Sequence, residues 1–164
     1  MLSHEVMNMM WTQKEASLLE DLKKQEQLCV DKYTEYMNRA NAPELKNLFQ
    51  SIRDTEQQHL QTISGMINGQ LPQPQQSTNN QNASWQPPQQ QAVPQTAAMQ
   101  ADAYLCQDAL DTEKHVSSSY DTAVFEFRAP AARQVLSDIQ GAEQYHGEMI
   151  YAYMARNGMY QANS

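Results

Sequence analysis

Residues 52–63 have the sequence IRDTEQQHLQTI, and residues 139–150 have the sequence IQGAEQYHGEMI. In each segment an isoleucine, a glutamate, a histidine and a second isoleucine follow one another at intervals of four, three and four residues. These intervals place all four side chains on one face of an α-helix. A carboxylate and an imidazole therefore stand where a core-facing helix would otherwise carry apolar residues, and they do so twice.

The sequence around both segments has the periodicity of helices. Apolar residues recur at three- and four-residue intervals over residues 12–39 and 43–67, and again on either side of Pro130. Pro43 and Pro130 break the pattern and suit the first turn of a new helix, while an Asn-Gly pair ends the second and the fourth stretch. No segment alternates as a strand does. We predict an all-α four-helix bundle made of two helical hairpins.

The two hairpins are copies of one unit. Shifting the chain by 87 positions, which carries Ile52 onto Ile139, aligns the halves without a gap, and identities are far more frequent than chance would give. The aligned identical pairs include Leu18 and Leu105, Asp21 and Asp108, Glu26 and Glu113, Tyr33 and Tyr120, Pro43 and Pro130, His59 and His146, and Ile63 and Ile150.

A long crossover separates the hairpins. Residues 68–101 contain no Asp, Glu, Lys or Arg and are mostly Gln, Pro, Asn and Ala, so they have too little apolar surface to offset the entropy of ordering. If a twofold axis across the bundle relates the hairpins, their link has to run the full length of the bundle, roughly 40 Å. We predict one bundle domain, residues 11–158, between a flexible tail 1–10 and a C-terminal tail 159–164. The domain consists of hairpin 12–68, crossover 69–98 and hairpin 99–158.

The composition excludes several classes of function. The 164 residues carry a formal net charge of -8, whereas nucleic-acid binding requires clustered lysine and arginine. No apolar run approaches the length of a membrane span, and the first residues lack the features of a signal peptide. We therefore expect no nucleic-acid partner, no membrane insertion and no export signal. Cys29 and Cys106 fall within helical patterns, and we interpret both as reduced thiols in the core.

Six polar residues interrupt the apolar faces of the predicted helices, and no lysine or arginine takes such an inward position. Glu26 precedes the hinge at Asn41 by 15 residues and Glu56 follows it by 15, so both lie at the same level, roughly 22 Å from the turn. The second half repeats this spacing around Arg128. Buried carboxylates are tolerated only when they are protonated, paired or bound to cations. The six residues are Glu26, Glu56, His59, Glu113, Glu143 and His146.

This set matches the ligands of one class of metal site. One glutamate from each of two helices plus Glu-x-x-His from each of the other two is the ligand set of a carboxylate-bridged di-iron or di-manganese centre. Carboxylate oxygens suit divalent iron or manganese, and one neutral imidazole per ion raises affinity without adding charge. We predict that the six residues bind two iron or manganese ions and expect Glu56 and Glu143 to bridge them, although spacing leaves the assignment of each glutamate open. The terminal ligands would then be Glu26 with His59 and Glu113 with His146.

Two tyrosines accompany the six residues. Tyr33 and Tyr120 lie seven residues after the first glutamate of each half and on the same face. They are either hydrogen-bond donors or redox neighbours of the site, or packed aromatic residues with satisfied hydroxyls.

Other candidates have plainer interpretations. A lone Glu-x-x-His is usually a solvated i, i+3 pair, and duplication makes the second copy dependent on the first. His115 lies about 200° around its helix from Glu113 and is expected to face solvent. His4 falls in the N-terminal tail, where we expect no ordered structure. Met7, Met9 and Met10 resemble a soft-metal cluster, but we favour an adhesive terminus or docking patch.

The ligand pattern and the long crossover resemble the ferritin-like di-metal superfamily, which includes rubrerythrins, bacterioferritins and manganese catalases. Within it, residues 18–50 (LLEDLKKQEQLCVDKYTEYMNRANAPELKNLFQ) and 146–161 (HGEMIYAYMARNGMYQ) are similar to the spore coat protein F family. The most specific part is the pattern formed by Tyr153, Met154, Gly158 and Tyr160. The resemblance covers both hairpins. It implies a ferritin-like bundle made in the mother cell cytoplasm and placed in the spore coat, with other coat proteins or further copies of the chain as partners.

The resemblance brings no activity with it. The chain has no Cys-x-x-Cys pair, so a rubrerythrin-type peroxidase cycle would need an external electron donor. Two hypotheses follow. In the first, the di-metal site acts on peroxide or oxidises metal, as a ferroxidase, peroxidase or catalase does, with hydrogen peroxide as a possible small oxidant. In the second, the chain is a structural coat or docking module in which any metal only stabilises the bundle.

Overall fold

The computed structural model describes residues 10–72, 89 and 95–159, and within these residues all regular structure is helical. The helices are α2 (Gln13–Arg39), α3 (Pro43–Ile67), α4 (Ala97–Glu126) and α5 (Pro130–Arg156). The predicted all-α fold with two hairpins and a long crossover is confirmed. Most of the tail predicted at 1–10, of the crossover at 69–98 and of the tail at 159–164 lies outside the described residues.

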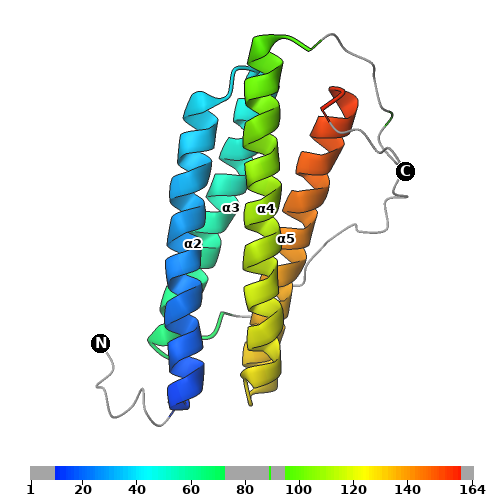
Figure 1. The fold of residues 1–164 in the computed structure, drawn as a ribbon. Helices are drawn as coiled ribbons and strands as arrows, with labels where there is room; N and C mark the ends of the chain where they lie inside the picture. The colour runs from blue at the N-terminus through cyan, green and yellow to red at the C-terminus, as the bar shows by residue number, and fades with distance from the viewer. Residues whose placement is uncertain (1–9, 73–88, 90–94, 160–164) are drawn as a thin grey trace.

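The four helices form two antiparallel hairpins that pack side by side (Figure 1). Helix α2 packs against α3 and α4 against α5, and the hairpins meet through α2 with α4 and through α3 with α5. Helix α3 ends at the lower end of the bundle in Figure 1, whereas α4 begins at the upper end. The connection between the hairpins therefore has to cover the length of the bundle, and α2 and α4 run in opposite directions.

The helix ends follow from local chemistry. Thr12 and Glu15 form a capping box at the start of α2, and a proline opens both α3 and α5. Gly69 and Gly158 have φ values of 83° and 66°, the left-handed conformation that a glycine adopts without steric cost. Each glycine follows a capping asparagine and closes its helix with backbone hydrogen bonds to the preceding turn. The Asn-Gly pairs therefore act as predicted.

In each hairpin, a carboxylate accepts hydrogen bonds from backbone N–H groups in the turn of the other hairpin. The Asp102 carboxylate in α4 accepts hydrogen bonds from the backbone N–H groups of Asn41 and Ala42, at 2.8 and 3.0 Å. The Glu15 carboxylate in α2 accepts from the backbone N–H of Arg128 at 3.0 Å and from its guanidinium. Glu15 and Asp102 are 87 positions apart, so the repeat extends to the contacts that tie the hairpins together.

The apolar core consists of two clusters with a polar layer between them. One cluster includes Leu19, Leu22, Ile63, Met66 and Leu136, and the other includes Leu45, Phe49, Ile52, Leu105 and Ile150. Cys29 and Cys106 are free thiols buried in these clusters, as predicted. None of the described helices combines the length and the apolar character needed to cross a membrane.

We predict that Asp102→Ala destabilises the bundle by about 2–3 kcal/mol, because it leaves the backbone N–H groups of the Asn41 turn without a buried charged acceptor. Urea unfolding followed by circular dichroism measures this loss. Asp111→Ala is the matched control, because Asp111 is an exposed acid of the same helix. Equal midpoints for the two variants would show that the contact between α4 and the α2–α3 turn contributes nothing to stability.

Candidate metal centre

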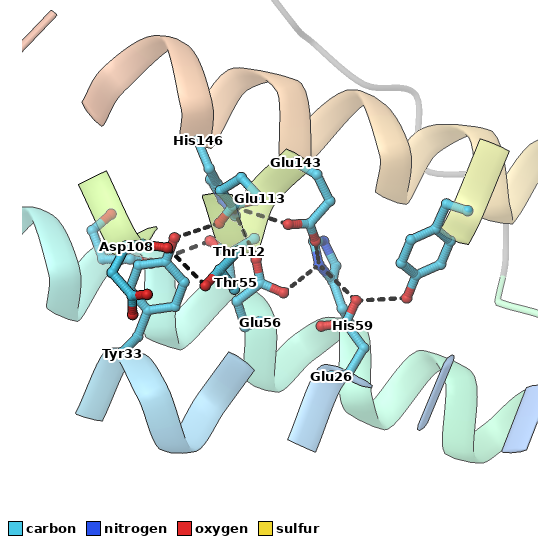
Figure 2. A network of polar contacts seen from close by, with 12 residues as sticks. Glu26, Tyr33, Thr55, Glu56, His59, Asp108, Thr112, Glu113, Glu143 and His146 are labelled. Carbon is cyan, nitrogen blue, oxygen red and sulfur yellow. Dashed lines mark hydrogen bonds and ion pairs between the residues drawn. The ribbon is translucent and has the colours of Figure 1, made fainter. Parts of the chain in front are cut away.

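The polar layer contains all six residues that the sequence singled out (Figure 2). Glu26 comes from α2, Glu56 and His59 from α3, Glu113 from α4, and Glu143 and His146 from α5. None of the six is more than 8% exposed. Four carboxylates and two imidazoles thus share one buried volume, here called the cage.

Each histidine points across the bundle to the opposite hairpin. The Nδ1 atom of His59 lies 2.9 Å from Oε1 of Glu143, and Nδ1 of His146 lies 3.0 Å from Oε1 of Glu56. The contacts to the glutamate three residues earlier on the same helix are longer, at 3.4 Å for His59 and 3.7 Å for His146. The two imidazole rings face each other with centroids 6.3 Å apart. The Glu-x-x-His segments therefore form one site together rather than two separate i, i+3 pairs.

The donor atoms fall into two overlapping groups. Glu26, Glu56, His59 and Glu143 each offer a ligand atom within 4.8 Å of the others, and Glu56, Glu113, Glu143 and His146 do the same. Carboxylate oxygens and imidazole nitrogens lie about 2.0–2.2 Å from a divalent transition-metal ion that they bind. Two ligand atoms of one ion are therefore at most about 4.4 Å apart. The groups thus need little adjustment to hold one ion each. Glu56 and Glu143 belong to both groups, which is the arrangement that bridging carboxylates require.

Three carboxylate oxygens in the cage accept no hydrogen bond from a nitrogen or hydroxyl group. They are Oε2 of Glu26, Oε2 of Glu113 and Oε2 of Glu143, all buried. Among the described residues, no ion pair joins a lysine or arginine to any cage carboxylate. A buried, unpartnered carboxylate oxygen is costly unless a cation binds it. The donor set and these free oxygens fit a pair of divalent metal ions.

Tyr33 and Tyr120 each donate a hydrogen bond to one carboxylate oxygen of the cage. The Tyr33 hydroxyl donates to Oε1 of Glu113, and the Tyr120 hydroxyl donates to Oε1 of Glu26, both at 2.6 Å. Each tyrosine therefore binds a glutamate of the opposite hairpin and leaves the other oxygen of that glutamate for the interior. Both rings are fully buried, so the hydroxyls are satisfied and the aromatic rings are packed at the same time.

Without metal, the cage keeps protons on two carboxylates. Burial, hydrogen bonding with Glu56 and the charge of Glu56 raise the pKa of Glu26 to about 11. Burial and the hydrogen bond shared with Glu113, together with the charges of its neighbours, raise the pKa of Glu143 well above its usual range. Both groups are therefore neutral near pH 7 when no cation is bound.

Glu56 and His146, whose pKa values are also shifted, form a charged pair in the cage. Burial alone would raise the pKa of Glu56, but hydrogen bonds from His146 and His59 outweigh burial and hold that pKa far below its usual range. Burial would lower the pKa of His146, but hydrogen bonds to Glu113 and Glu56 raise it to about 9. The metal-free cage thus balances its charge with protons, and a cation that displaced them would take over that role.

A further polar network adjoins the cage at Tyr33. The Tyr36 hydroxyl donates a hydrogen bond to Oδ2 of Asp108, and the Lys32 ammonium lies 3.5 Å from the same oxygen. Lys32 also donates to the hydroxyl of Thr112 at 2.9 Å. The sequence does not reveal this network, because helical periodicity places Tyr36 among the apolar positions of its helix. The alignment of Asp108 with Asp21 was a signal, but it did not indicate which residue Asp108 contacts.

The remaining candidates lie elsewhere. His115 is exposed on α4, as predicted, and Met10 is also exposed. His4, Met7 and Met9 lie outside the described residues, so the interpretations of the N-terminal tail stay predictions.

In a comparison with known protein families, one family model matches the second hairpin. The model of the Coat F domain matches residues 101–163, so the C-terminal half of the chain carries a Coat F domain. This match includes Glu113, Glu143 and His146, which is half of the cage, and it does not extend to the first hairpin. No curated protein and no solved structure matches the chain. The chain is therefore a four-helix bundle with a Coat F domain and a buried glutamate and histidine cluster that resembles a di-metal site.

We predict that metal reverses the pH dependence of stability. The unfolded chain releases carboxyl protons near about pH 4.5 and histidine protons near about pH 6.5, whereas the metal-free folded chain retains those of Glu26, Glu143 and His146. The folded state then binds more protons than the unfolded state, so the melting temperature of metal-free protein falls as pH rises from about 5 to 9. Bound metal requires deprotonated ligands, so the metal-loaded protein becomes more stable as pH rises from about 5 to 7.

Melting curves recorded with chelator and with manganese measure both slopes. Glu143→Gln removes one retained proton and flattens the metal-free slope, whereas Glu148→Gln, at an exposed position of the same helix, leaves it unchanged. A metal-free melting temperature that rises across this range would contradict the protonated cage.

Proposed function

We propose that the chain binds two ions of divalent iron or manganese in the cage, with Glu56 and Glu143 bridging them. The observation that carries this proposal is the overlap of the two donor groups in these two buried glutamates. Four carboxylates supply four negative charges and two divalent ions supply four positive charges, so full loading neutralises the cage once its protons have left. No single ion could use all six donors at comparable distances.

The residues of the cage have separate tasks in this proposal. Glu26 and Glu113 act as terminal ligands, and the hydroxyls of Tyr120 and Tyr33 fix their orientation. His59 and His146 present Nδ1 to the interior, so each would bind as a neutral imidazole and add no charge. A pair of redox-active ions held in this way supplies two-metal chemistry on peroxide or dioxygen. We propose oxidation of metal or turnover of peroxide as the activity.

The Coat F domain supports a place in the spore coat. We propose that the chain is made in the mother cell cytoplasm and associates there with other coat proteins or with further copies of itself. Metal chemistry at this place would act on oxidants that reach the spore from outside.

One observation favours a second function. The cage takes three ligands from each hairpin, and the Tyr33 and Tyr120 contacts also cross between hairpins. A metal pair would therefore clamp the two halves of the bundle together. In that case the chain is a structural coat or docking module, and the ions contribute stability without turnover.

We predict that purified protein from metal-replete cells contains two ions of iron or manganese per chain, measured by elemental analysis. Glu56→Gln loses both ions, because the bridging position serves both. His59→Gln and His146→Gln each retain about one ion, since each removes a terminal ligand of one ion only. Glu148→Gln is the control and retains both. Circular dichroism of every variant separates loss of metal from loss of fold.

Failure to bind two ions in the folded wild-type protein would overturn the proposal. The same proteins decide between the two functions. Steady consumption of hydrogen peroxide or of ferrous ion that disappears in Glu56→Gln supports the redox function. Full metal content and a raised melting temperature with no such consumption support the structural one.

A further inference from the structure

The two halves of the bundle differ beside the cage. Tyr36 in α2 is replaced by Ala123 at the corresponding position of α4, and Lys32 is replaced by Ser119. As a result, Tyr33 has a second tyrosine ring in contact with it, whereas the position that corresponds to Tyr36 in the second half is an alanine. A duplicated site that had only to hold metal symmetrically would not need this difference.

On the Tyr33 side, redox-active groups lie in an unbroken series. The Tyr33 hydroxyl is bonded to Glu113 of the cage. The rings of Tyr33 and Tyr36 meet edge to face, with centroids 5.4 Å apart and an interplanar angle of 89°. The Tyr36 hydroxyl is bonded to Asp108, whose side chain is 42% exposed.

The surroundings hold both rings in place. Phe49 packs against Tyr33 and Tyr36, with centroids 5.9 and 5.4 Å away. Tyr36 itself is only 4% exposed, so its ring is shielded while its hydroxyl reaches the partly exposed carboxylate of Asp108. The Lys32 ammonium lies 3.5 Å from that carboxylate. The series therefore begins at a buried ligand and ends at a group that solvent reaches.

We propose that Tyr33 and Tyr36 form an electron relay between the surface at Asp108 and the cage. This inference rests on the proposed redox function of the cage. With an oxidised metal pair in the cage, Tyr33 would give up one electron, and its phenolic proton would move along its hydrogen bond to Glu113. Tyr36 then gives one electron to Tyr33, which recovers its proton from Glu113, while the Tyr36 proton moves to Asp108. A one-electron reductant of the ascorbate class, bound at the surface, reduces Tyr36, which recovers its proton from Asp108.

Electrons and protons balance over these steps. One electron leaves the external reductant and arrives at the cage, and each tyrosine ends in its starting state. No proton crosses between the tyrosines, which agrees with the separate carboxylate partner of each hydroxyl. Tyr120 orients Glu26 but has no second tyrosine, so it takes no part in the relay.

The first test uses iron-loaded protein oxidised with stoichiometric hydrogen peroxide, mixed with ascorbate and frozen at intervals for electron paramagnetic resonance. The wild type shows a short-lived tyrosyl radical. Tyr36→Phe slows the decay of the Tyr33 radical by about tenfold, which corresponds to a barrier raised by about 1.4 kcal/mol. Tyr33→Phe abolishes this radical, and Tyr145→Phe, at an exposed position of α5, behaves as the wild type. Unchanged decay in Tyr36→Phe, or loss of the radical in Tyr145→Phe, overturns the relay.

A second test needs no metal, so it separates failure of the relay from failure of the proposed function. A ruthenium photo-oxidant is attached through an Asp111→Cys substitution, one turn from Asp108, and the buried native thiols of Cys29 and Cys106 remain unlabelled. The background carries Tyr104→Phe, which removes an exposed tyrosine on the same helix face.

After a flash, the labelled chain contains radicals of both Tyr33 and Tyr36, and the two phenylalanine substitutions assign them. Tyr33→Phe leaves the Tyr36 component, whereas Tyr36→Phe removes both. A Tyr33 component that persists in Tyr36→Phe overturns the relay whether or not the chain binds metal.

Discussion

Four carboxylates buried at one level, with no lysine or arginine paired to them among the described residues, are the constraint on which the rest of this structure depends. Such a layer cannot be stable as four bare charges in a medium of low dielectric. The metal-free chain meets the constraint with protons on Glu26 and Glu143 and with a charged pair of Glu56 and His146. Three carboxylate oxygens have no nitrogen or hydroxyl donor, so only protons shared between carboxyl groups satisfy them when no cation is bound. Two divalent cations would satisfy both the charge and the free oxygens.

The duplication explains how the chain builds this layer. A hairpin alone carries two glutamates and one histidine, and its short contacts run to the other hairpin: His59 to Glu143 and His146 to Glu56. The Coat F domain covers only one hairpin, so in this chain half of the cage lies outside the matched region. The acids that hold the turns also act between hairpins. The bundle and the cage are therefore products of the same pseudo-twofold arrangement.

Much of this arrangement could be predicted from the sequence. Pro43 and Pro130 set the starts of two helices, and equal spacing of the glutamates from the hinges predicted their common level, because helical rise is constant. The contacts that depend on how two hairpins face each other could not be predicted. Periodicity placed His59 beside Glu56, three residues earlier, yet its shortest contact is to Glu143. Hydropathy made Tyr36 a core residue, but its hydroxyl reaches Asp108, which only the packing of α2 on α4 reveals.

Anomalous diffraction at the iron and manganese absorption edges, from crystals of protein purified from metal-replete cells, tests the central claim most directly. We predict two anomalous peaks inside the bundle, one among Glu26, Glu56, His59 and Glu143 and the other among Glu56, Glu113, Glu143 and His146. A cage that contains no anomalous peak, with its carboxylates paired through protons or water in protein known to have had both metals available, would contradict it.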